Sequence, residues 1–399
     1  MNAFERLLNF SDSEKAEKGV LHTPAEIAQQ PETWAKTLVM LHDRRDDILS
    51  FMISSGLVGD REAVLVLTGA GSSEFVGTAV CSILRRALNR EVMSVPTTHL
   101  VTHPRAALVP WHSYVIVSFA RSGNSPESIA TFDFIRKVQP SARHMVITCN
   151  RDGGLAQRAG NDPESFLIVL PDETNDRSLV MTSSFSTMAF TAAGVAHIRS
   201  LVKFGKVSEK IQRAARRITG EYGDLLSDFA RKDFSRACFL GSDTLWGTME
   251  ECQLKLLEMT EGRIAARFDS YLGLRHGPRV FVNDDCVVVA ALSSDPVVRR
   301  YEMDLLRELK HKRQGCGTLV VCDHATKEIS EVATHIIELF PDEEPVEDCF
   351  RVMTDVVVGQ VLATFKSLDL GLKPDNPSTT GVINRVVQGV VIYDTQELP

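Results

Sequence analysis

The sequence has 399 residues, 44% of them hydrophobic and 24% charged, which is enough for two packed domains. Its formal net charge of -8 and the lack of a long basic stretch argue against a nucleic-acid partner. No apolar run approaches the roughly 18 residues that a membrane span needs, and the first residues lack the pattern of a signal peptide. We therefore expect a cytoplasmic protein that has no membrane partner and binds a small molecule.

The eight cysteines form no C-x-x-C pair, and most lie in apolar stretches. Spacing of this kind is typical of reduced thiols in a protein core and not of disulfides or zinc ligands. No H-x-E or H-E-x-x-H pattern is present either. We therefore expect no metal and no cofactor.

Residues 1–49 are predicted to form a helical N-terminal extension. Residues 50–205 then alternate buried-type strands with helical stretches, which is the βαβ pattern of a parallel sheet covered by helices on both faces. A charged helical stretch over 206–234 is predicted to link this part to a second α/β domain over 235–372, and 373–399 to form a loop and a short strand. The predicted strands are 63–69, 114–120, 144–149, 166–171, 237–242, 286–294, 318–323 and 335–341.

The two halves repeat each other at a nearly constant offset. Gly69 and Gly241 are 172 positions apart, and so are Val115 and Val287. The tripeptide "VMT" recurs after 172 positions, and "LPDE" returns as "FPDE" after 170. Four matches in order, in similar strand contexts, predict a duplicated α/β unit.

Serine and glycine are concentrated in loops of the first half, "TGAGSSE" (68–74) and "ARSGNSPES" (120–128), and "MTSSFST" (181–187) opens a further helix. Helix N-termini beyond the carboxyl ends of parallel strands offer N–H groups to anions. The corresponding loops of the second half carry Asp243 and Asp295, which would repel an anion. We expect phosphate to bind in the first half, through Ser72, Ser73, Ser122, Gly123, Asn124 and Ser125.

The alternative is that these serines only cap helices, as Ser125 is expected to do before a helix that starts at Pro126. A dinucleotide site is not expected, because Glu74 stands where that fingerprint has its third glycine. A monophosphate held by hydroxyl and amide groups fits the loops better.

The loops "GAGSS" and "SGNSPES", with "RHGPR" (275–279) and "NRVVQG" (384–389), resemble the sugar isomerase (SIS) domain family over about residues 50–395. The chain is most similar to AgaS-type tagatose-6-phosphate ketose/aldose isomerases and galactosamine-6-phosphate deaminases, and less to the isomerase half of glucosamine-6-phosphate synthase. The resemblance implies two tandem SIS domains, each a flavodoxin-like, doubly wound parallel sheet flanked by helices. It also implies a sugar-phosphate substrate and a homodimer or higher homo-oligomer.

The helical stretch 248–262 places Glu251, Lys255 and Glu258 at i, i+4 and i+7, hence on one face. Such spacing alone is the usual sign of a solvated face with an ion pair. The resemblance implies instead that Glu258 transfers a proton between C1 and C2 of the sugar, while the other two residues orient it. It also implies that His276 assists ring opening, often in a neighbouring subunit, whereas a histidine before Gly-Pro could equally be a turn residue.

The resemblance further implies that the substrate contacts Gly71, Arg121, Ser183, Ser184, Asn384 and Arg385. The chain departs from the synthase in three ways. Ala120 replaces a serine of the phosphate loop, the glutamate helix and His276 are two residues further apart, and the C-terminal loop has no lysine. No amidotransferase domain precedes the first SIS domain, so glutamine-dependent synthesis is not expected.

Three activities are compatible with these residues. An amino-sugar phosphate deaminase would convert galactosamine 6-phosphate to tagatose 6-phosphate and ammonia, and this is the function that the AgaS likeness favours. A plain aldose-ketose isomerase of a hexose 6-phosphate would use the same proton transfer. A sugar-phosphate sensor would bind without turnover, but the acidic charge and the Glu258 face argue against it.

Overall fold

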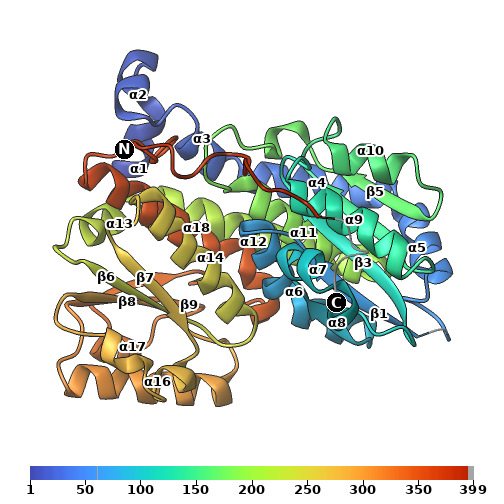
Figure 1. Cartoon of the computed structure of the whole chain (residues 1–399). Helices are drawn as coiled ribbons and strands as arrows, with labels where there is room; N and C mark the ends of the chain where they lie inside the picture. Colours follow the sequence, from blue (N-terminus) through green and yellow to red (C-terminus); the bar gives the residue numbers. More distant parts are fainter. Residues whose placement is uncertain (61, 394–399) are drawn as a thin grey trace. The chain divides into compact units, whose positions relative to one another are not determined.

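The computed structural model describes residues 1–60 and 62–393, which form two compact units, each built around one sheet (Figure 1). The first-sheet unit comprises Thr33–Asn175, Ser183–Gly205 and the residues from Ile383 onward. The second-sheet unit comprises Met1–Glu32, Asp176–Thr182 and Lys206–Val382. Two of the five divisions fall inside helices, namely α4 (Gln30–Asp43) and α12 (Leu201–Glu221).

The first-sheet unit contains five parallel strands in the order β2-β1-β3-β4-β5. All six residues of β1 are buried, because helices cover both faces of the sheet. Helix α6 packs against α11, and α9 packs against α7, α8 and α10. The elements are α5 (Arg45–Ser54), β1 (Ala63–Thr68), α6 (Ser72–Leu88), β2 (Val92–Ser94), α7 (Thr97–Thr102), α8 (Pro104–Ala107), β3 (Ser113–Ala120), α9 (Pro126–Val138), β4 (Arg143–Thr148), α10 (Gly154–Gly160), β5 (Ser165–Val169), η1 (Asp172–Thr174), α11 (Ser183–Ala196) and η2 (Ile198–Ser200).

The second-sheet unit also has five parallel strands, in the order β10-β9-β8-β6-β7, with α14 and α18 on one face and α16 and α17 on the other (Figure 1). Helices of the N-terminal extension belong to this unit. The elements are α1 (Ala3–Asn9), α2 (Asp12–Lys18), α3 (Thr23–Ala28), α13 (Gly223–Ala230), β6 (Arg236–Leu240), α14 (Thr244–Met259), β7 (Ala265–Asp269), α15 (Tyr271–Leu274), η3 (Pro278–Phe281), β8 (Cys286–Ala291), α16 (Pro296–His311), β9 (Gly317–Cys322), α17 (Lys327–Val332), β10 (His335–Glu338) and α18 (Asp348–Asp369).

The two sheets have one topology, which confirms the predicted α/β duplication. Counting from the first strand of each unit, both sheets follow the order 2-1-3-4-5 of a doubly wound fold. The pairing register is also repeated: Leu65 lies opposite Val115 in one sheet, and Ala237 lies opposite Val287 in the other. The "VMT" match behaves differently, because 180–182 precede α11 whereas 352–354 lie inside α18. Helix α18 has 22 residues and α11 has 14, so its additional turns overlap that match.

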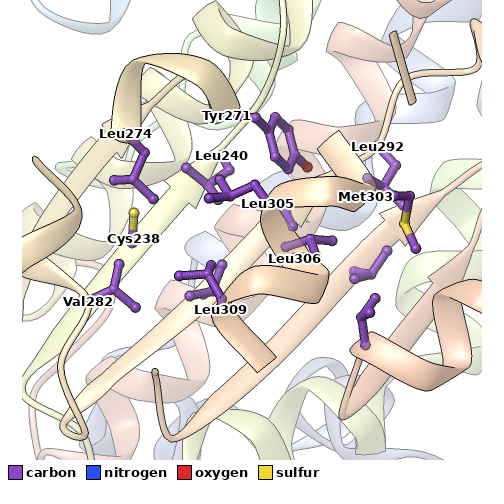
Figure 2. Close-up of a cluster of buried hydrophobic side chains, with 14 of the residues drawn as sticks. Cys238, Leu240, Tyr271, Leu274, Val282, Leu292, Met303, Leu305, Leu306 and Leu309 are labelled. Carbon is purple, nitrogen blue, oxygen red and sulfur yellow. The ribbon is translucent and has the colours of Figure 1, made fainter. Parts of the chain in front are cut away.

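The core of the second-sheet unit joins α16 to the central strands. Figure 2 shows Leu305, Leu306 and Leu309 of α16 directed toward Leu240 and Cys238 of β6. All three leucines are at most 2% exposed. Burial of a leucine side chain contributes roughly 1.5–3 kcal/mol, so this face holds α16, and the loop before it, against the sheet.

The sequence did not predict the strands β2 and β7, which lie beside β1 and β6 at the sheet edges. Both are only partly buried, and so lack the continuous apolar run of a central strand. The predicted link over 206–234 is made of α12 and α13. Residues 373–393 contain no strand, and the remainder of the predicted C-terminal strand lies outside the described residues. Within the described chain no helix is long and apolar enough to cross a membrane.

Candidate active site

The Ser-rich loops of the first-sheet unit flank the point where its strand order reverses. Strands β1 and β3 pair in parallel, with Thr68 opposite Ser118 near their carboxyl ends. The chain then leaves β1 toward β2 on one side and leaves β3 toward β4 on the other. Ligands of open α/β sheets bind in the crevice at this switch point. The predicted phosphate loops are therefore neighbours at the position where the fold favours a ligand.

The loop after β1 has a backbone that requires glycine. Gly71 precedes α6 with φ 56° and ψ -132°, a region that side chains disfavour. At Gly69 an added Cβ would lie 2.4 Å from the backbone carbon of Ser73, so the loop passes directly over the first turn of α6. Ser72 and Ser73, the first two residues of α6, are 5% and 6% exposed. The glycines thus set the close approach between this loop and the helix N-terminus.

The loop after β3 is fixed by the loop after β4. Asn150 Nδ2 donates a hydrogen bond to the Ser122 carbonyl at 2.8 Å, and the Gly154 N–H donates to Asn124 Oδ1 at 2.9 Å. Gly123 has φ 66° and its carbonyl accepts from Leu155 N at 2.9 Å. These contacts hold Ser122, Gly123 and Asn124 in one conformation before any ligand binds.

The structure corrects the predicted cap at Ser125. The residue is the N-cap of α9, and Pro126 is the first helical residue as predicted, but the Ser125 side chain makes no capping hydrogen bond. Ser183 and Ser184, which begin α11, are both fully buried. Ser125 is partly exposed, whereas the serines of α11 lie inside the unit.

The C-terminal segment contacts the loop after β3. Arg121, 7% exposed, donates from Nη2 to the carbonyl of Arg385 at 2.6 Å. Arg385 in turn donates from Nη2 to Asn175 Oδ1 at 2.7 Å. Asn384 is exposed beside them. The structure therefore brings together three of the residues predicted to contact substrate, although Arg121 and Arg385 are 264 positions apart.

The predicted acid–base residues form one buried ionic group on α14 of the second-sheet unit. Lys255 Nζ lies 3.3 Å from Glu251 Oε1 and 2.6 Å from Glu258 Oε2. The side chains of Glu251 and Lys255 are 0% and 1% exposed, whereas that of Glu258 is 25% exposed. A solvated helix face is thereby excluded, and Glu258 is the member of the group that solvent reaches.

The group lies beside a close contact between α14 and α18. Helix α18 approaches α14 so closely that a Cβ on Gly359 would lie 2.5 Å from Cys252 Sγ. Burial, and next the Glu251 carboxylate, raise the pKa of the Cys252 thiol well above its ordinary value. Charges interact more strongly in such an environment than in water, so Lys255 holds Glu258 firmly in place.

His276 lies in an exposed turn between α15 and η3 of the second-sheet unit. The turn is held at both sides through Glu308 of α16: Arg275 Nη1 lies 3.2 Å from Glu308 Oε2, and Arg279 forms an ion pair with the same carboxylate. The Arg279 and Lys312 hydrogen bonds lower the pKa of Glu308 to about 2. The imidazole itself is free to face solvent while its backbone is fixed.

Sequence reasoning missed the residues that support these loops. Asn150 follows β4 directly, and the glycine pair 153–154 after it is the signal that could have pointed to a loop packed against another. Thr97 was also missed: its hydroxyl donates to the Gly69 carbonyl at 3.0 Å. No periodicity marks such residues, because their partners, Ser122 and Gly69, lie in loops that follow other strands.

Two doubly wound units in tandem, one with Ser-rich loops at its switch point and the other with a Glu-Lys-Glu helix, define the class of double sugar isomerase (SIS) domain proteins. The chain is 35% identical over 376 residues to D-galactosamine-6-phosphate deaminase AgaS of Escherichia coli. The aligned region covers 94% of this chain and 96% of that protein. The chain therefore belongs to the AgaS family. No family model matches it.

One solved structure supports this assignment, and a more distant one shares the fold. Tagatose-6-phosphate ketose/aldose isomerase from Escherichia coli superposes with a TM-score of 0.85 at 33% identity, over 94% of this chain and 97% of that one. The C-terminal domain of glucosamine-fructose-6-phosphate aminotransferase from Francisella tularensis has a TM-score of 0.69 at 16% identity, over 89% of this chain and 98% of that one. The latter likeness concerns the fold alone.

Proposed function

We propose that the protein is an amino-sugar phosphate deaminase that converts galactosamine 6-phosphate and water to tagatose 6-phosphate and ammonia. The observation that carries the proposal is the Glu251-Lys255-Glu258 group, in which a buried lysine orients a carboxylate that solvent reaches. The names of the AgaS relatives supply the substrate.

The chemistry requires a proton to move from C2 to C1 of the open-chain sugar. Glu258 would remove the C2 proton, giving an enolamine, and return it to C1 to give the ketimine at C2. Water then adds to the C2 carbon, and the carbon–nitrogen bond breaks to release ammonia and leave the ketone. Because C4 is untouched, a galactosamine phosphate gives a tagatose phosphate.

The phosphate would be held by Ser72, Ser73, Ser122 and Ser125 and by nearby backbone N–H groups. A substrate that carries a phosphate cannot diffuse through a membrane, which favours a cytoplasmic site of action. Ser122→Ala removes a donor to a charged oxygen, so affinity for the sugar phosphate should fall by about 1.5–3 kcal/mol in calorimetry. Ser13→Ala, at an exposed position of α2, is the matched control. Unchanged affinity in Ser122→Ala would place the phosphate elsewhere.

We further propose that the protein acts as a homodimer or higher homo-oligomer in which His276 opens the ring of a sugar bound to the neighbouring subunit. The turn that carries His276 is exposed, and so are apolar side chains on either side of it, Leu272 at 51% and Val280 at 84%. Mixing inactive Glu258→Gln with inactive His276→Ala subunits should restore part of the activity. No recovery after verified subunit exchange would contradict the shared site.

The reaction is tested by supplying galactosamine 6-phosphate to the purified protein and measuring ammonia and ketose phosphate. A carboxamide cannot accept the C2 proton, so Glu258→Gln should lose about 10²–10⁴-fold in turnover while it still binds substrate. Ketose phosphate formed from an aldose phosphate, with no ammonia from any amino sugar, would select the plain isomerase. Tight binding with neither product nor exchange of the C2 proton into heavy water would select the sensor.

A further inference from the structure

The second-sheet unit has a switch point of its own, between β6 and β8, but its polar groups are already used. At the offset of 172 positions, Ser242 corresponds to Ala70, and Ser293 and Ser294 correspond to Arg121 and Ser122. These serines therefore stand where the first-sheet unit presents its phosphate loops. Four of their donors bind carboxyl groups of the unit itself, and the Ser294 hydroxyl donates to the Val346 carbonyl at 3.4 Å.

The first of these carboxyl groups is that of Glu302 on α16, which is 1% exposed. Glu302 Oε1 accepts from the Ser242 hydroxyl at 2.6 Å, and Oε2 accepts from the Ser293 N–H at 2.7 Å. One carboxyl group thus ties the loop after β6 to the loop after β8. Its two oxygens take the place that two oxygens of a phosphate would take between a hydroxyl and a backbone N–H.

Asp348, the first residue of α18, is the second such group. Its Oδ1 accepts from the Ser294 N–H at 2.7 Å, and its Oδ2 accepts from the Ser293 hydroxyl. The buried Arg351 lies 3.6 Å from this carboxylate and donates to the Leu292 carbonyl. Four donors of the two loops are therefore satisfied by two carboxyl groups.

Glu302 has no carboxyl counterpart in the first-sheet unit, whereas Asp348 corresponds at the offset of 172 positions to Asp176, whose carboxylate accepts from the Thr182 N–H at 2.8 Å. Helices α9 and α16 both begin with proline, and six residues later α9 has Phe132 where α16 has Glu302. Asp348 belongs to the turns by which the 22-residue α18 exceeds the 14-residue α11. The difference at Glu302 is thus a substitution in one helix, and Asp348 differs from Asp176 in that it is part of a helix.

The loop that Glu302 fixes is also the loop that precedes the Glu-Lys-Glu helix. Asp243 has φ 51° and ψ -119°, almost the conformation of Gly71 in the other unit, although it carries a side chain. Backbone conformations of this kind persist only where the surroundings impose them. The neighbouring residue, Ser242, is the one that Glu302 binds.

We propose that Glu302, assisted by Asp348, is a positioning residue whose carboxyl group substitutes internally for a bound phosphate and fixes the start of α14, so that Glu251, Lys255 and Glu258 are in place before substrate binds. As a consequence each chain binds one sugar phosphate, in the first-sheet unit. The catalytic part of this inference rests on the proposed function.

The test is Glu302→Ala, because the side chain lost is nearly that of acetate. We expect turnover to fall about 10- to 100-fold with KM for galactosamine 6-phosphate unchanged, since positioning and not phosphate binding is affected. Added acetate should restore turnover several-fold in Glu302→Ala, and not in the native protein. Glu331→Ala, an exposed glutamate of α17, is the matched control. Glu302→Gln, which retains an acceptor for Ser242, should keep more turnover than Glu302→Ala.

A second measurement does not depend on activity. Acetate that occupies the vacated position should raise the melting temperature of Glu302→Ala by about 2 °C or more, with no effect on Glu331→Ala. If the native protein has no deaminase or isomerase activity, the proposed function fails while this shift still supports the carboxyl substitution. Should acetate change neither turnover nor melting temperature, or should calorimetry give two sugar phosphates per chain, the inference is overturned. If Glu302→Ala does not fold, Ser242→Ala replaces it in the test. Reduced turnover with an unchanged KM in Ser242→Ala supports the inference, and native turnover in Ser242→Ala contradicts it.

Discussion

Lys255→Met should destabilise the protein because it leaves a buried carboxylate without its cation. Methionine keeps the length of the lysine stem, so packing against α18 changes little. Glu251 is fully buried and its ion pair with Lys255 is broken. Removing one partner of a buried pair typically costs 3–5 kcal/mol, whereas exposed pairs are worth less than about 1 kcal/mol. We therefore expect the free energy of unfolding to fall by about 3 kcal/mol or more, which corresponds to a fall of roughly 6 °C or more in melting temperature.

The double variant Lys255→Met/Glu251→Gln separates the charge effect from packing. Because glutamine carries no charge, the double variant should be more stable than Lys255→Met alone, although two residues have been changed. Turnover should remain low in both, since Glu258 has lost the ammonium group that holds it at 2.6 Å. Thermal unfolding and ammonia release measure the two effects. The reasoning would be refuted if the free energy of unfolding of Lys255→Met lay within about 0.5 kcal/mol of that of the native protein, or if the double variant were less stable than Lys255→Met.

Three further predictions concern the scaffold. Gly71→Ala should lower the free energy of unfolding by about 1–3 kcal/mol, as measured by urea unfolding. The loss comes from backbone strain alone, because an added Cβ at Gly71 has no atom within 4 Å. Burial, and next the Asp176 carboxylate, raise the pKa of Glu26 to about 7. Protonation of Glu26 therefore stabilises the folded protein. This contribution is complete below about pH 4.5 and is lost as the pH rises through 7. Glu26→Gln should abolish this part of the pH dependence of the free energy of unfolding, which is about 3 kcal/mol in the native protein. An unchanged pH dependence of stability would contradict the role of Glu26. Asp375→Ala removes the acceptor for the N–H and hydroxyl of Thr23, at 2.7 and 2.8 Å, and should speed proteolysis of the C-terminal segment relative to the native chain.

The sequence itself determined the central strands and the faces of the main helices. Strands buried on both faces need continuous apolar residues, so "AVLVLT" and "CVVVAA" are strands wherever they pack. The spacing of Glu251, Lys255 and Glu258 places them on one side of any helix, and only glycine adopts the backbone of Gly71 without strain. These are local constraints, and local sequence is enough to read them.

Tertiary structure decided which of these groups became a site. Nothing in the sequence of α16 distinguishes Glu302, which binds Ser242 across 60 positions, from the solvated glutamates of other helices. The same holds for Arg121, whose partner is a carbonyl 264 positions away, and for Ser125, whose hydroxyl is not used as a cap. Hydrogen-bond partners and burial depend on packing between distant segments. For that reason two copies of one α/β unit present the predicted phosphate loops in one case and loops bound by carboxyl groups in the other.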